Sequence, residues 1–571
     1  MPGTSVLINE KLPSEEEIRL DDAVGLSYLD RSPVLRLHLS KNIMRDRFGA
    51  ALFTAFLPLL LVSTAAGQVA RMRVDRRQRA VRVEPTPSSP YLIGQQPPRH
   101  TLQHQGTVRG LAFSADGKFL ASAAGDQTAR LWGATSGVEL RKLEAQGGAY
   151  FCLAFCPQGR VVALGTSSGF IRIWDVAANR PPVRLAGTQR AVHDVAFSPD
   201  GKLLASAGED GTICVWEWSA GKVQKQFGNH RGAVDCVVFS PDGRSVASSG
   251  EDGSIRIWNA RDGKEQRHLE GHQGPVPVVR FSPDGATLVS AGQDQTIRFW
   301  EVSTGEELRR LTRHEGRVRA LAFSDDGRTL ASAGADHVIR LWEVAGGEER
   351  MELRGHAGEI DTLAFAPGGR LLASGSDDRT ARLWDASGLP ARSQPLKLSA
   401  QEVEKRWSDL ASPDAARAYR ALWILADAGG QVLPFIREHL PHTEHVATTN
   451  PERVSELVAE LDNDQFATRE KATEELEQIG KPAEAPLRKL LSGRHSAEAA
   501  LRATYLLENL KAPLLTTQRL RSLRTIELLE RIGTREARRL VQELAEGPAD
   551  ARLMREAKAS LDRLSRQQVT R

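Results

Sequence analysis

Seven tryptophans recur at a fixed spacing and limit the fold of this chain more than any other feature. Each lies 42 residues from the next: Trp132, Trp174, Trp216, Trp258, Trp300, Trp342 and Trp384. Seven phenylalanines keep the same spacing, from Phe113 to Phe365. A repeat of roughly 20 to 50 residues indicates one supersecondary unit that stacks on its neighbours to bury an apolar face. The middle of the chain is therefore predicted to be an array of seven similar units.

Each unit has the pattern of a meander of short strands. An alternating apolar strand leads into a turn such as Ser198–Gly201, where Pro199 fixes φ and Gly201 supplies a positive φ. A strand of small residues follows, as in Leu204–Gly208, and then a strand such as Ile255–Trp258. Strands joined by tight turns predict antiparallel sheets within each unit.

These residues resemble the WD40 family, in which a repeat of about 40 to 45 residues makes one four-stranded propeller blade. The resemblance implies a seven-bladed β-propeller over residues 99–386. It also implies that the strand around His100–Leu102 completes the last blade, because nothing comparable follows Trp384 before the next linker. The spacing from this strand to Phe113 is one residue shorter than in the other repeats.

A polar set recurs within the repeats and could suggest a hydrolase, because it contains Ser, His and Asp. Its repetition favours a structural role. The resemblance implies a network in which the side chains satisfy one another inside each blade, as buried polar groups must. The complete sets are His104, Ser122, Asp126, Trp132; His230, Ser248, Asp252, Trp258; His272, Ser290, Asp294, Trp300; His314, Ser332, Asp336, Trp342; and His356, Ser374, Asp378, Trp384.

The second and third repeats depart from this pattern. The second has Gln146, Leu164 and Ser168 at the His, Ser and Asp positions, and the third has Thr188 in place of His. Because they lack the full network, these two blades are predicted to open most readily.

The resemblance also implies which residues face the narrower surface, where partners dock: those just after the His position and just before the turn Asp. The candidate partner-binding residues are Arg109, His193, Glu209, Asp235, Glu251, Arg317, Arg319, Glu359, Asp361 and Asp377. Acidic residues gather in two sectors, one from Glu209 to Glu251 and one from Glu359 to Asp377, with two arginines beside the second. Such a surface favours a partner of mixed but net basic charge.

The N-terminal region carries a possible export signal. Residues 48–70 are 23 uncharged residues that follow a polar leader at 1–47. A start at Met44 would give a signal peptide with a small-residue cleavage site near Gly67, and residues 1–43 would then not belong to the protein. A signal anchor, and so a membrane tether through 48–70, is the alternative. A basic and then Pro-rich linker follows at 71–98. We expect an exported (periplasmic or secreted) or membrane-anchored protein; a cytoplasmic location is the alternative.

After a linker at 387–398, the pattern changes from strands to helices over residues 399–565, with a short tail at 566–571. Apolar residues recur every three or four positions, and Ser399 with Glu402 has the pattern of a capping box. Nine or ten helices fit this length. The motif Leu476–Gly480 is echoed at Leu529–Gly533, which resembles HEAT or armadillo helical pairs. The region is also similar to helical extensions that follow WD40 arrays in some bacterial proteins.

Little in the sequence favours catalysis or a cofactor. The four cysteines have no disulfide or zinc spacing and are expected to be buried. The net charge of +4 gives no case for specific nucleic-acid binding. The segment from His439 to His445 holds three histidines and Glu444, but Pro441 interrupts it, so a polar loop is favoured over a metal site.

The predicted fold class is therefore multidomain β then α: a seven-bladed WD40 propeller followed by a helical repeat-like domain. The predicted function is a non-catalytic protein–protein interaction scaffold that presents a propeller face and a helical surface. We predict no catalytic, cofactor or metal residues, and other proteins as partners. Two alternatives stay open: a ligand-binding receptor or enzyme that uses the propeller channel or the His439 loop, and a self-associating structural protein of the envelope.

Overall fold

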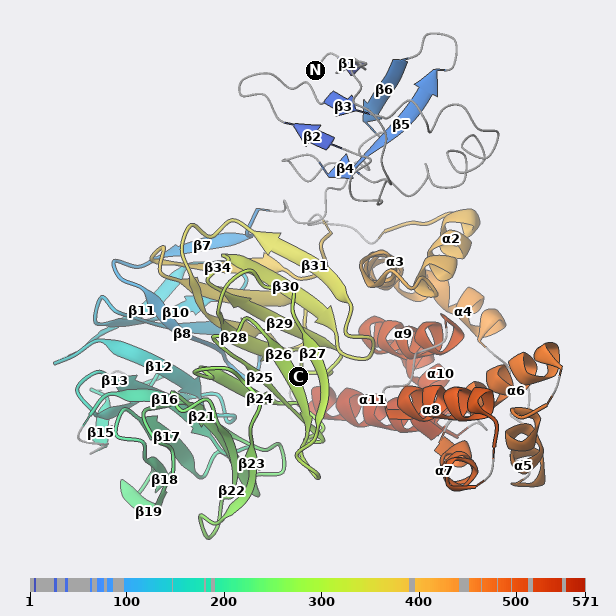
Figure 1. The fold of residues 1–571 in the computed structure, drawn as a ribbon. Helices are drawn as coiled ribbons and strands as arrows, with labels where there is room; N and C mark the ends of the chain where they lie inside the picture. Colours follow the sequence, from blue (N-terminus) through green and yellow to red (C-terminus); the bar gives the residue numbers. More distant parts are fainter. Residues whose placement is uncertain are drawn as a thin grey trace. The chain divides into compact units, whose positions relative to one another are not determined.

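The structure is a computed structural model of all 571 residues. It describes six strands before residue 97, and then residues 97–569 except for 146, 179–180, 186–189, 390–395, 441–450, 464, 480, 494, 512–516 and 547–550. The chain divides into two compact units, residues 1–93 and 94–571. Figure 1 shows the blades of the propeller and the helices of the second unit.

The described part of the first unit consists of strands. They are β1 (Ser5–Val6), β2 (Gly25–Ser27), β3 (Arg36–His38), β4 (Val62–Ser63), β5 (Val69–Asp75) and β6 (Ala80–Pro85), in a sheet of order β1-β6-β5-β4 and a β2-β3 pair. The predicted linker at 71–98 thus contains most of the β5–β6 hairpin, in which Arg alternates with Met and Val at the period of a strand. Most of the predicted signal segment at 48–70 lies outside the described residues. Among those described, no helix is long and apolar enough to cross a membrane.

Seven four-stranded antiparallel sheets form the propeller. Blades 1 to 3 are β8 (Val108–Phe113), β9 (Phe119–Ala124), β10 (Thr128–Gly133), β11 (Glu139–Glu144); β12 (Tyr150–Phe155), β13 (Val161–Thr166), β14 (Ile171–Asp175), β15 (Val183–Leu185); and β16 (Val192–Phe197), β17 (Leu204–Gly208), β18 (Ile213–Glu217), β19 (Lys222–Phe227). Blades 4 and 5 are β20 (Val234–Phe239), β21 (Ser245–Gly250), β22 (Ile255–Asn259), β23 (Glu265–Leu269); and β24 (Val278–Phe281), β25 (Thr287–Ala291), β26 (Ile297–Glu301), β27 (Glu307–Leu311). Blades 6 and 7 are β28 (Val318–Phe323), β29 (Thr329–Gly334), β30 (Val338–Glu343), β31 (Glu349–Arg354); and β32 (Ile360–Phe365), β33 (Leu371–Ser376), β34 (Thr380–Asp385), β7 (His100–Gln103).

Closure of the ring follows the sequence prediction. β7 pairs with β34 as the outer strand of blade 7, with Thr101 opposite Arg382. The residue of blade 6 equivalent to Thr101 is Glu352, which pairs with Arg340. Glu352 lies four residues before His356, whereas Thr101 lies only three residues before His104. The shorter spacing is therefore absorbed between the strand and the His position, and the register of β7 itself is regular.

The innermost strand of each blade contacts the innermost strands of its two neighbours, so these strands form a ring. The second strands are made of small residues that are almost fully buried, as in β17. At the turn that precedes β17, Gly201 has a φ of +68°, as the turn pattern predicted. Outer strands are mostly exposed in blades 1 and 3, which is normal for the edge of a propeller sheet.

The C-terminal region is helical and falls into two groups. The described α-helices are α2 (Ala400–Leu410), α3 (Ala415–Ala428), α4 (Leu433–His439), α5 (Pro451–Glu460), α6 (Phe466–Ile479), α7 (Glu484–Ser492), α8 (Ala497–Lys511), α9 (Thr517–Ile532), α10 (Arg535–Glu546) and α11 (Ala551–Val569), with short 3₁₀ turns η4 (Gly429–Val432) and η5 (Lys481–Ala483). Ser399 and Glu402 form the predicted capping box of α2. The repeated motif closes α6 and α9, and Gly533 has a φ of +64° after α9.

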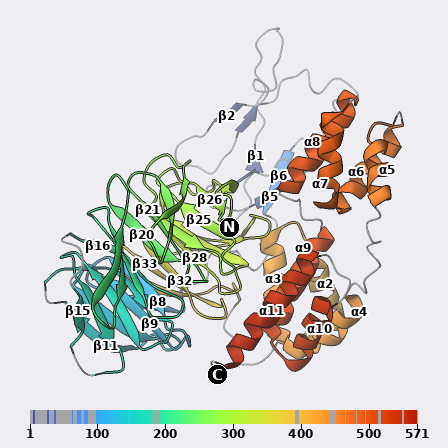
Figure 2. The same cartoon turned by 90° about the horizontal axis from the view of Figure 1, so that it is seen from below.

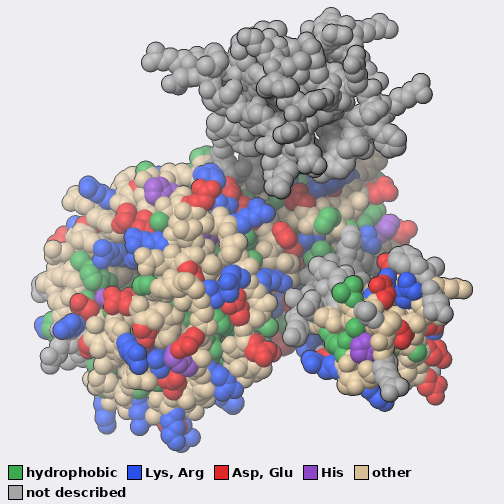
Figure 3. Space-filling model, in the orientation of Figure 1, with side chains coloured by type: hydrophobic (Ala, Val, Ile, Leu, Met, Phe, Trp, Pro, Cys, Tyr) green, Lys and Arg blue, Asp and Glu red, His purple; other side chains and the backbone are tan. Residues whose placement is uncertain are grey.

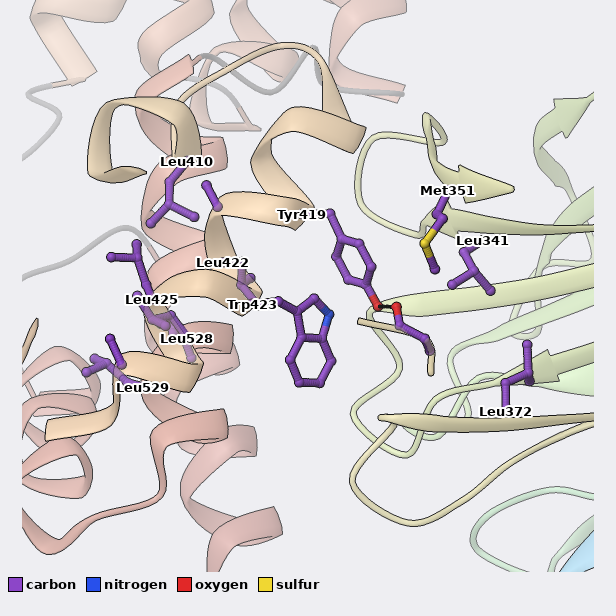
Figure 4. Packing of buried hydrophobic residues seen from close by; sticks show 14 of the residues in the cluster. Leu341, Met351, Leu372, Leu410, Tyr419, Leu422, Trp423, Leu425, Leu528 and Leu529 are labelled. Atoms are coloured by element: carbon purple, nitrogen blue, oxygen red, sulfur yellow. Dashed lines mark hydrogen bonds between the residues drawn. The ribbon is translucent and has the colours of Figure 1, made fainter. Parts of the chain in front are cut away.

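The first helical group, α2–α4 with α9–α11, shares a hydrophobic core with blades 6 and 7 of the propeller. Helices α9, α10 and α11 pack on one another, and α3 lies against α9 (Figure 2). Helix α3 also packs on β31, and Figure 4 shows Tyr419 directed from α3 toward Met351 and Leu341. The Tyr419 hydroxyl donates to the Ala386 carbonyl at 3.0 Å. We call this contact of blades 6 and 7 with helices α3 and α9 the seam.

Buried ion pairs cross the seam. Arg350 of β31 donates to Glu527 of α9 at 3.0 and 3.2 Å and to Glu343 of β30 at 3.2 Å. Arg524 of α9 donates to both oxygens of Glu343 at 2.9 Å. These four side chains are at most 4% exposed, so their charges are tolerated only because each is paired.

The second helical group, α5–α8, has a hydrophobic core of its own. Its helices pack as the pairs α5–α6 and α7–α8, and α5 contacts α7 while α6 contacts α8. In sequence, this group is inserted between α4 and α9. The region that was predicted as one helical domain thus contains two cores, because the helices on either side of the insertion belong with the propeller.

Candidate interaction face

The recurring polar set forms a closed network inside each of five blades. In blade 5, the Trp300 indole N–H donates to Ser290 Oγ at 2.8 Å, and His272 Nε2 lies 2.7 Å from the same oxygen. His272 Nδ1 lies 3.0 Å from Asp294. The same contacts, at 2.6 to 3.2 Å, join the sets that begin at His104, His230, His314 and His356.

The hydrogen bonds assign the protons of this network. An indole N–H can only donate, so Ser290 Oγ accepts from Trp300 and is free to donate its own proton to His272 Nε2. The imidazole proton is then on Nδ1 and is donated to Asp294. The serine hydroxyl is thus held between two partners inside the sheet, which leaves it unsuited to act as a nucleophile.

The pKa values of the network fit this assignment. Burial lowers the pKa of His272, in spite of the nearby Asp294 carboxylate, and so favours the neutral ring. Burial alone would raise the pKa of Asp294, but hydrogen bonds from the Gln273 backbone and from Thr296 and the charge interaction with His272 outweigh it and lower the pKa to about 2. The set therefore contains a neutral histidine and an ionised aspartate at neutral pH.

Blades 2 and 3 lack this closed set. In blade 2, Leu164 is fully buried where other blades have the serine, and the Ser168 hydroxyl donates to the Gly147 carbonyl at 2.7 Å. In blade 3, the indole of Trp216 still donates to Ser206 at 2.9 Å. Gln146 and Thr188 lie outside the described residues.

Residues 42 apart meet at the mouth of the propeller channel. The inner strands lie side by side in a ring, so the same position in two neighbouring blades is in contact. Four pairs at this spacing interact there: Arg109 with Phe151, His193 with Asp235, Arg317 with Glu359, and Arg319 with Asp361. The repeat length itself could have predicted these pairs, but the sequence interpretation treated each residue alone.

The arginines of blade 6 hold the carboxylates of blade 7. Arg317 donates from Nε and Nη2 to the two oxygens of Glu359 at 2.7 and 2.6 Å, and Arg319 Nε lies 2.8 Å from Asp361. The exposed fraction of the side chain is 47% for Arg317 and 40% for Arg319, but only 12% for Glu359 and 10% for Asp361. Two of the three carboxylates expected on blade 7 are therefore largely covered, whereas Asp377 and the guanidinium groups reach the solvent.

Arg109 of blade 1 extends this group across the closure of the ring. Its guanidinium lies over the Phe151 ring, 4.7 Å from the centroid, and its side chain is exposed. The Thr107 hydroxyl of the same blade donates to Asp377 of blade 7 at 2.8 Å. We name Arg109, Arg317, Arg319, Glu359, Asp361 and Asp377 the arginine sector.

Asp361 lies at the centre of the arginine sector. Burial raises the pKa of its carboxyl to about 6; the charges of Arg319 and Arg109 oppose this shift, and those of Asp377 and Glu359 add to it. The carboxyl is therefore mostly ionised at neutral pH and becomes neutral below about pH 6.

The other predicted acidic sector, on blades 3 and 4, does reach the solvent. Glu209 and Glu251 are exposed, and Glu251 accepts from the Ala233 N–H at 3.2 Å. Asp235 is 24% exposed and lies 3.2 Å from His193 Nδ1. The face thus has opposite charges on opposite parts of the ring, whereas basic and acidic side chains intermingle over the propeller surface that Figure 3 shows.

Comparison with known proteins agrees with the repeat pattern and the blades. The WD domain, G-beta repeat family matches the chain seven times, at residues 96–133, 137–175, 180–217, 221–259, 263–301, 305–343 and 347–385. This is a WD40-repeat protein. No curated protein sequence matches the chain significantly.

One polar group in this WD40 propeller escaped the sequence interpretation. Asp194, in the inner strand of blade 3, accepts from the N–H groups of Val195 and of Val237 in blade 4 at 2.9 and 3.0 Å. Arg280 of blade 5 donates to Cys236 Sγ at 3.0 Å and to the Val279 carbonyl at 2.8 Å. These contacts link the inner strands of three WD40 blades and give the group a structural role.

The four cysteines are free and buried, as predicted. Burial raises the pKa of Cys214 to about 11 and that of Cys236 to about 12, which keeps these thiols protonated.

The histidine cluster from His439 to His445, expected to be a polar loop, is only partly described. His439 ends α4, where its ring stacks on Phe435 at 3.9 Å between centroids and its Nδ1 lies 3.0 Å from the Phe435 carbonyl. His442, Glu444 and His445 lie outside the described residues. Within the described ranges, no group of three or more His, Cys, Asp or Glu side chains is arranged to hold a metal ion.

Proposed function

We propose that this WD40 protein is a non-catalytic scaffold that captures another protein on the face at the mouth of its propeller channel. WD40 propellers are in general interaction domains, and this one presents exposed charged side chains on a rigid ring of strands. The observation that carries the proposal is the set of contacts between blades at this face, such as Arg317 with Glu359. They hold the arginine side chains in place while leaving them exposed, which lowers the entropy lost on binding.

The α5–α8 group is proposed as the second surface of the scaffold. It has its own core, so its outer faces can serve a partner without disturbing the seam. A partner that touches both surfaces would gain avidity, because the second contact forms at a high local concentration.

Photocrosslinking tests the main proposal. A photoreactive residue replaces Glu209 or Arg231, which are exposed on the face, or Lys222, which is exposed at the opposite end of the strands of blade 3. The tagged full chain is irradiated in its native cells, and crosslinked proteins are identified by mass spectrometry. We expect the two face positions to capture the same protein and Lys222 not to capture it. The proposal fails if the face positions capture nothing, or only what Lys222 captures.

Export or membrane anchoring through residues 48–70 is proposed on the sequence alone. The intact mass of the mature native protein tests it. An N-terminus near Gly67 supports cleavage, and an uncleaved chain that fractionates with membranes supports an anchor. An uncleaved chain in the soluble cell fraction contradicts both.

A further inference from the structure

We infer that the arginine sector receives an acidic peptide segment of the partner protein; this inference rests on the proposed function. Arg109, Arg317 and Arg319 are the exposed or half-exposed cations of this sector, on blades 1 and 6. Glu359 and Asp361 lie beneath them and are at most 12% exposed. An approaching chain therefore meets three guanidinium groups and one exposed carboxylate, that of Asp377, so its own carboxylates are the main complementary groups.

The contacts of these arginines leave donors for a ligand. The pair with Glu359 uses two of the five N–H donors of the Arg317 guanidinium, and Arg319 meets Asp361 through Nε. A guanidinium can thus bind a carboxylate of the partner while it keeps its carboxylate within the protein. Because long Arg side chains lose rotamer entropy when they are fixed, holding them in place beforehand reduces the cost of binding.

Arg109 completes the sector through a different contact. Its guanidinium lies on the Phe151 ring, and both Arg109 and Arg319 act on the carboxyl of Asp361. Arg319 contacts the largely covered carboxyl of Asp361, and the charges of Arg109 and Arg317 also act on it. The exposed Glu209 and Glu251 lie on blades 3 and 4, so the acidic residues of the segment are directed to blades 6, 7 and 1.

Two variants isolate the role of the arginines. Arg109→Gln, Arg317→Gln and Arg319→Gln together remove the three charges. A matched control, Lys222→Gln, Arg261→Gln and Lys264→Gln, removes three exposed cations at the opposite end of the strands of blades 3 and 4. A third variant replaces the three arginines by lysine, which keeps the charge but loses the planar fork of donors. Equal thermal midpoints of the variants show that each is folded.

The experiment uses a library of random 12-residue peptides displayed on phage and selected on the full chain. We expect the selected peptides to be rich in Asp and Glu. Their affinity should fall at least about tenfold in the Gln triple and several-fold in the Lys triple, with less than about a twofold change in the control. Their affinity should also weaken as the salt concentration rises.

Two results would overturn the inference, and they differ in what they say of the proposed function. Selected peptides that are basic, and whose binding is lost on Glu209→Gln with Glu251→Gln but not in the Gln triple, refute the acidic segment and leave the interaction face intact. If no peptide is selected, or if binding of the selected peptides depends on neither part of the face, both the inference and the proposed function are refuted.

Discussion

At the scale of single residues, buried charge decides how firmly the helices hold the propeller. Arg350 is 3% exposed and contacts Glu527, Glu343 and Thr329, with its guanidinium 4.8 Å from the Tyr419 ring centroid. Removing one member of such a buried ion pair leaves the opposite charge buried without its full set of contacts. Exposed pairs behave differently, because water already solvates both ions.

Arg350→Met should therefore lower the free energy of unfolding by about 3 to 5 kcal/mol. The matched control is Arg354→Met in the same strand, where Arg354 is 57% exposed and pairs with Glu352; its effect should stay below about 1 kcal/mol. Urea unfolding followed by fluorescence measures both. Equal effects of the two variants would show that the seam is not the buried contact described above.

The histidines of the blades make stability depend on pH. Burial lowers the pKa of His104, His230, His272 and His356 below 6.5, so the unfolded chain takes up more protons than the folded chain as the pH falls below about 6.5. The aspartates of the network add a loss below about pH 4, because their pKa values are lowered in the folded state. Asp361 acts in the opposite sense because burial raises its pKa, and so do Asp194, Asp325 and Glu349.

Replacing Asp361 by Asn removes one of the opposing contributions, one that grows as the pH falls through about 6. The urea midpoint of that variant should therefore decrease, relative to that of the unmodified chain, between about pH 7 and about pH 5. A difference between the two midpoints that is the same at pH 7 and pH 5 would contradict the raised pKa of Asp361.

At the scale of elements, the repeat length predicted most of the propeller. Seven tryptophans at a step of 42 residues gave the number of blades, and the strand at His100 gave the closure. The seam was missed. Met351 occupies the place that Arg141, Lys225, Arg267 and Arg309 take in other outer strands, and Val183 takes it in blade 2. Val183 is 57% exposed, whereas Met351 is 7% exposed. The exchange therefore does not by itself predict the seam, because Val183 makes it too and stays exposed.

The same repeat logic could have predicted part of the face. His193 with Asp235, and Arg319 with Asp361, are 42 residues apart, as neighbours in the ring must be. What the sequence could not provide is which member of each pair is covered. The low exposure of Glu359 depends on the packing of two blades, and it changes the expected charge of the partner.

Blades 2 and 3 should be the least stable elements of the propeller. A closed His–Ser–Asp–Trp set fixes four side chains to one another, whereas Leu164 in blade 2 offers no hydrogen bond. Native-state hydrogen exchange should show faster exchange in β13 and β17 than in the matching strands β25 and β29. Equal protection of these four strands would contradict a stabilising role for the network.

At the scale of the whole molecule, the second unit combines the propeller with one helical group and carries α5–α8 as an insertion. The sequence predicted helices but not this division, because α5–α8 and α9–α11 have similar apolar periodicity. Only the contacts separate a core shared with blades 6 and 7 from a core internal to α5–α8.

Deleting residues 447–515 and joining the ends by a flexible Gly/Ser linker should leave the thermal midpoint of the propeller unchanged. Ending the chain at residue 389 instead removes α3 and α9, which exposes Met351 and the Ala386 carbonyl that Tyr419 contacts. This variant should have a lower thermal midpoint and should aggregate. Calorimetry and light scattering measure both variants. A similar loss in the two variants would show that α5–α8 is part of the same core.

The most direct test of the account is hydrogen exchange of the full chain with and without the partner identified by crosslinking at the face. If the channel mouth is the binding surface, added protection will fall on the starts of the inner strands, at residues 107–110, 149–152, 317–320 and 359–362. Protection confined to the outer strands, to α5–α8 or to the seam would contradict the central claim that the protein acts through the mouth of its propeller.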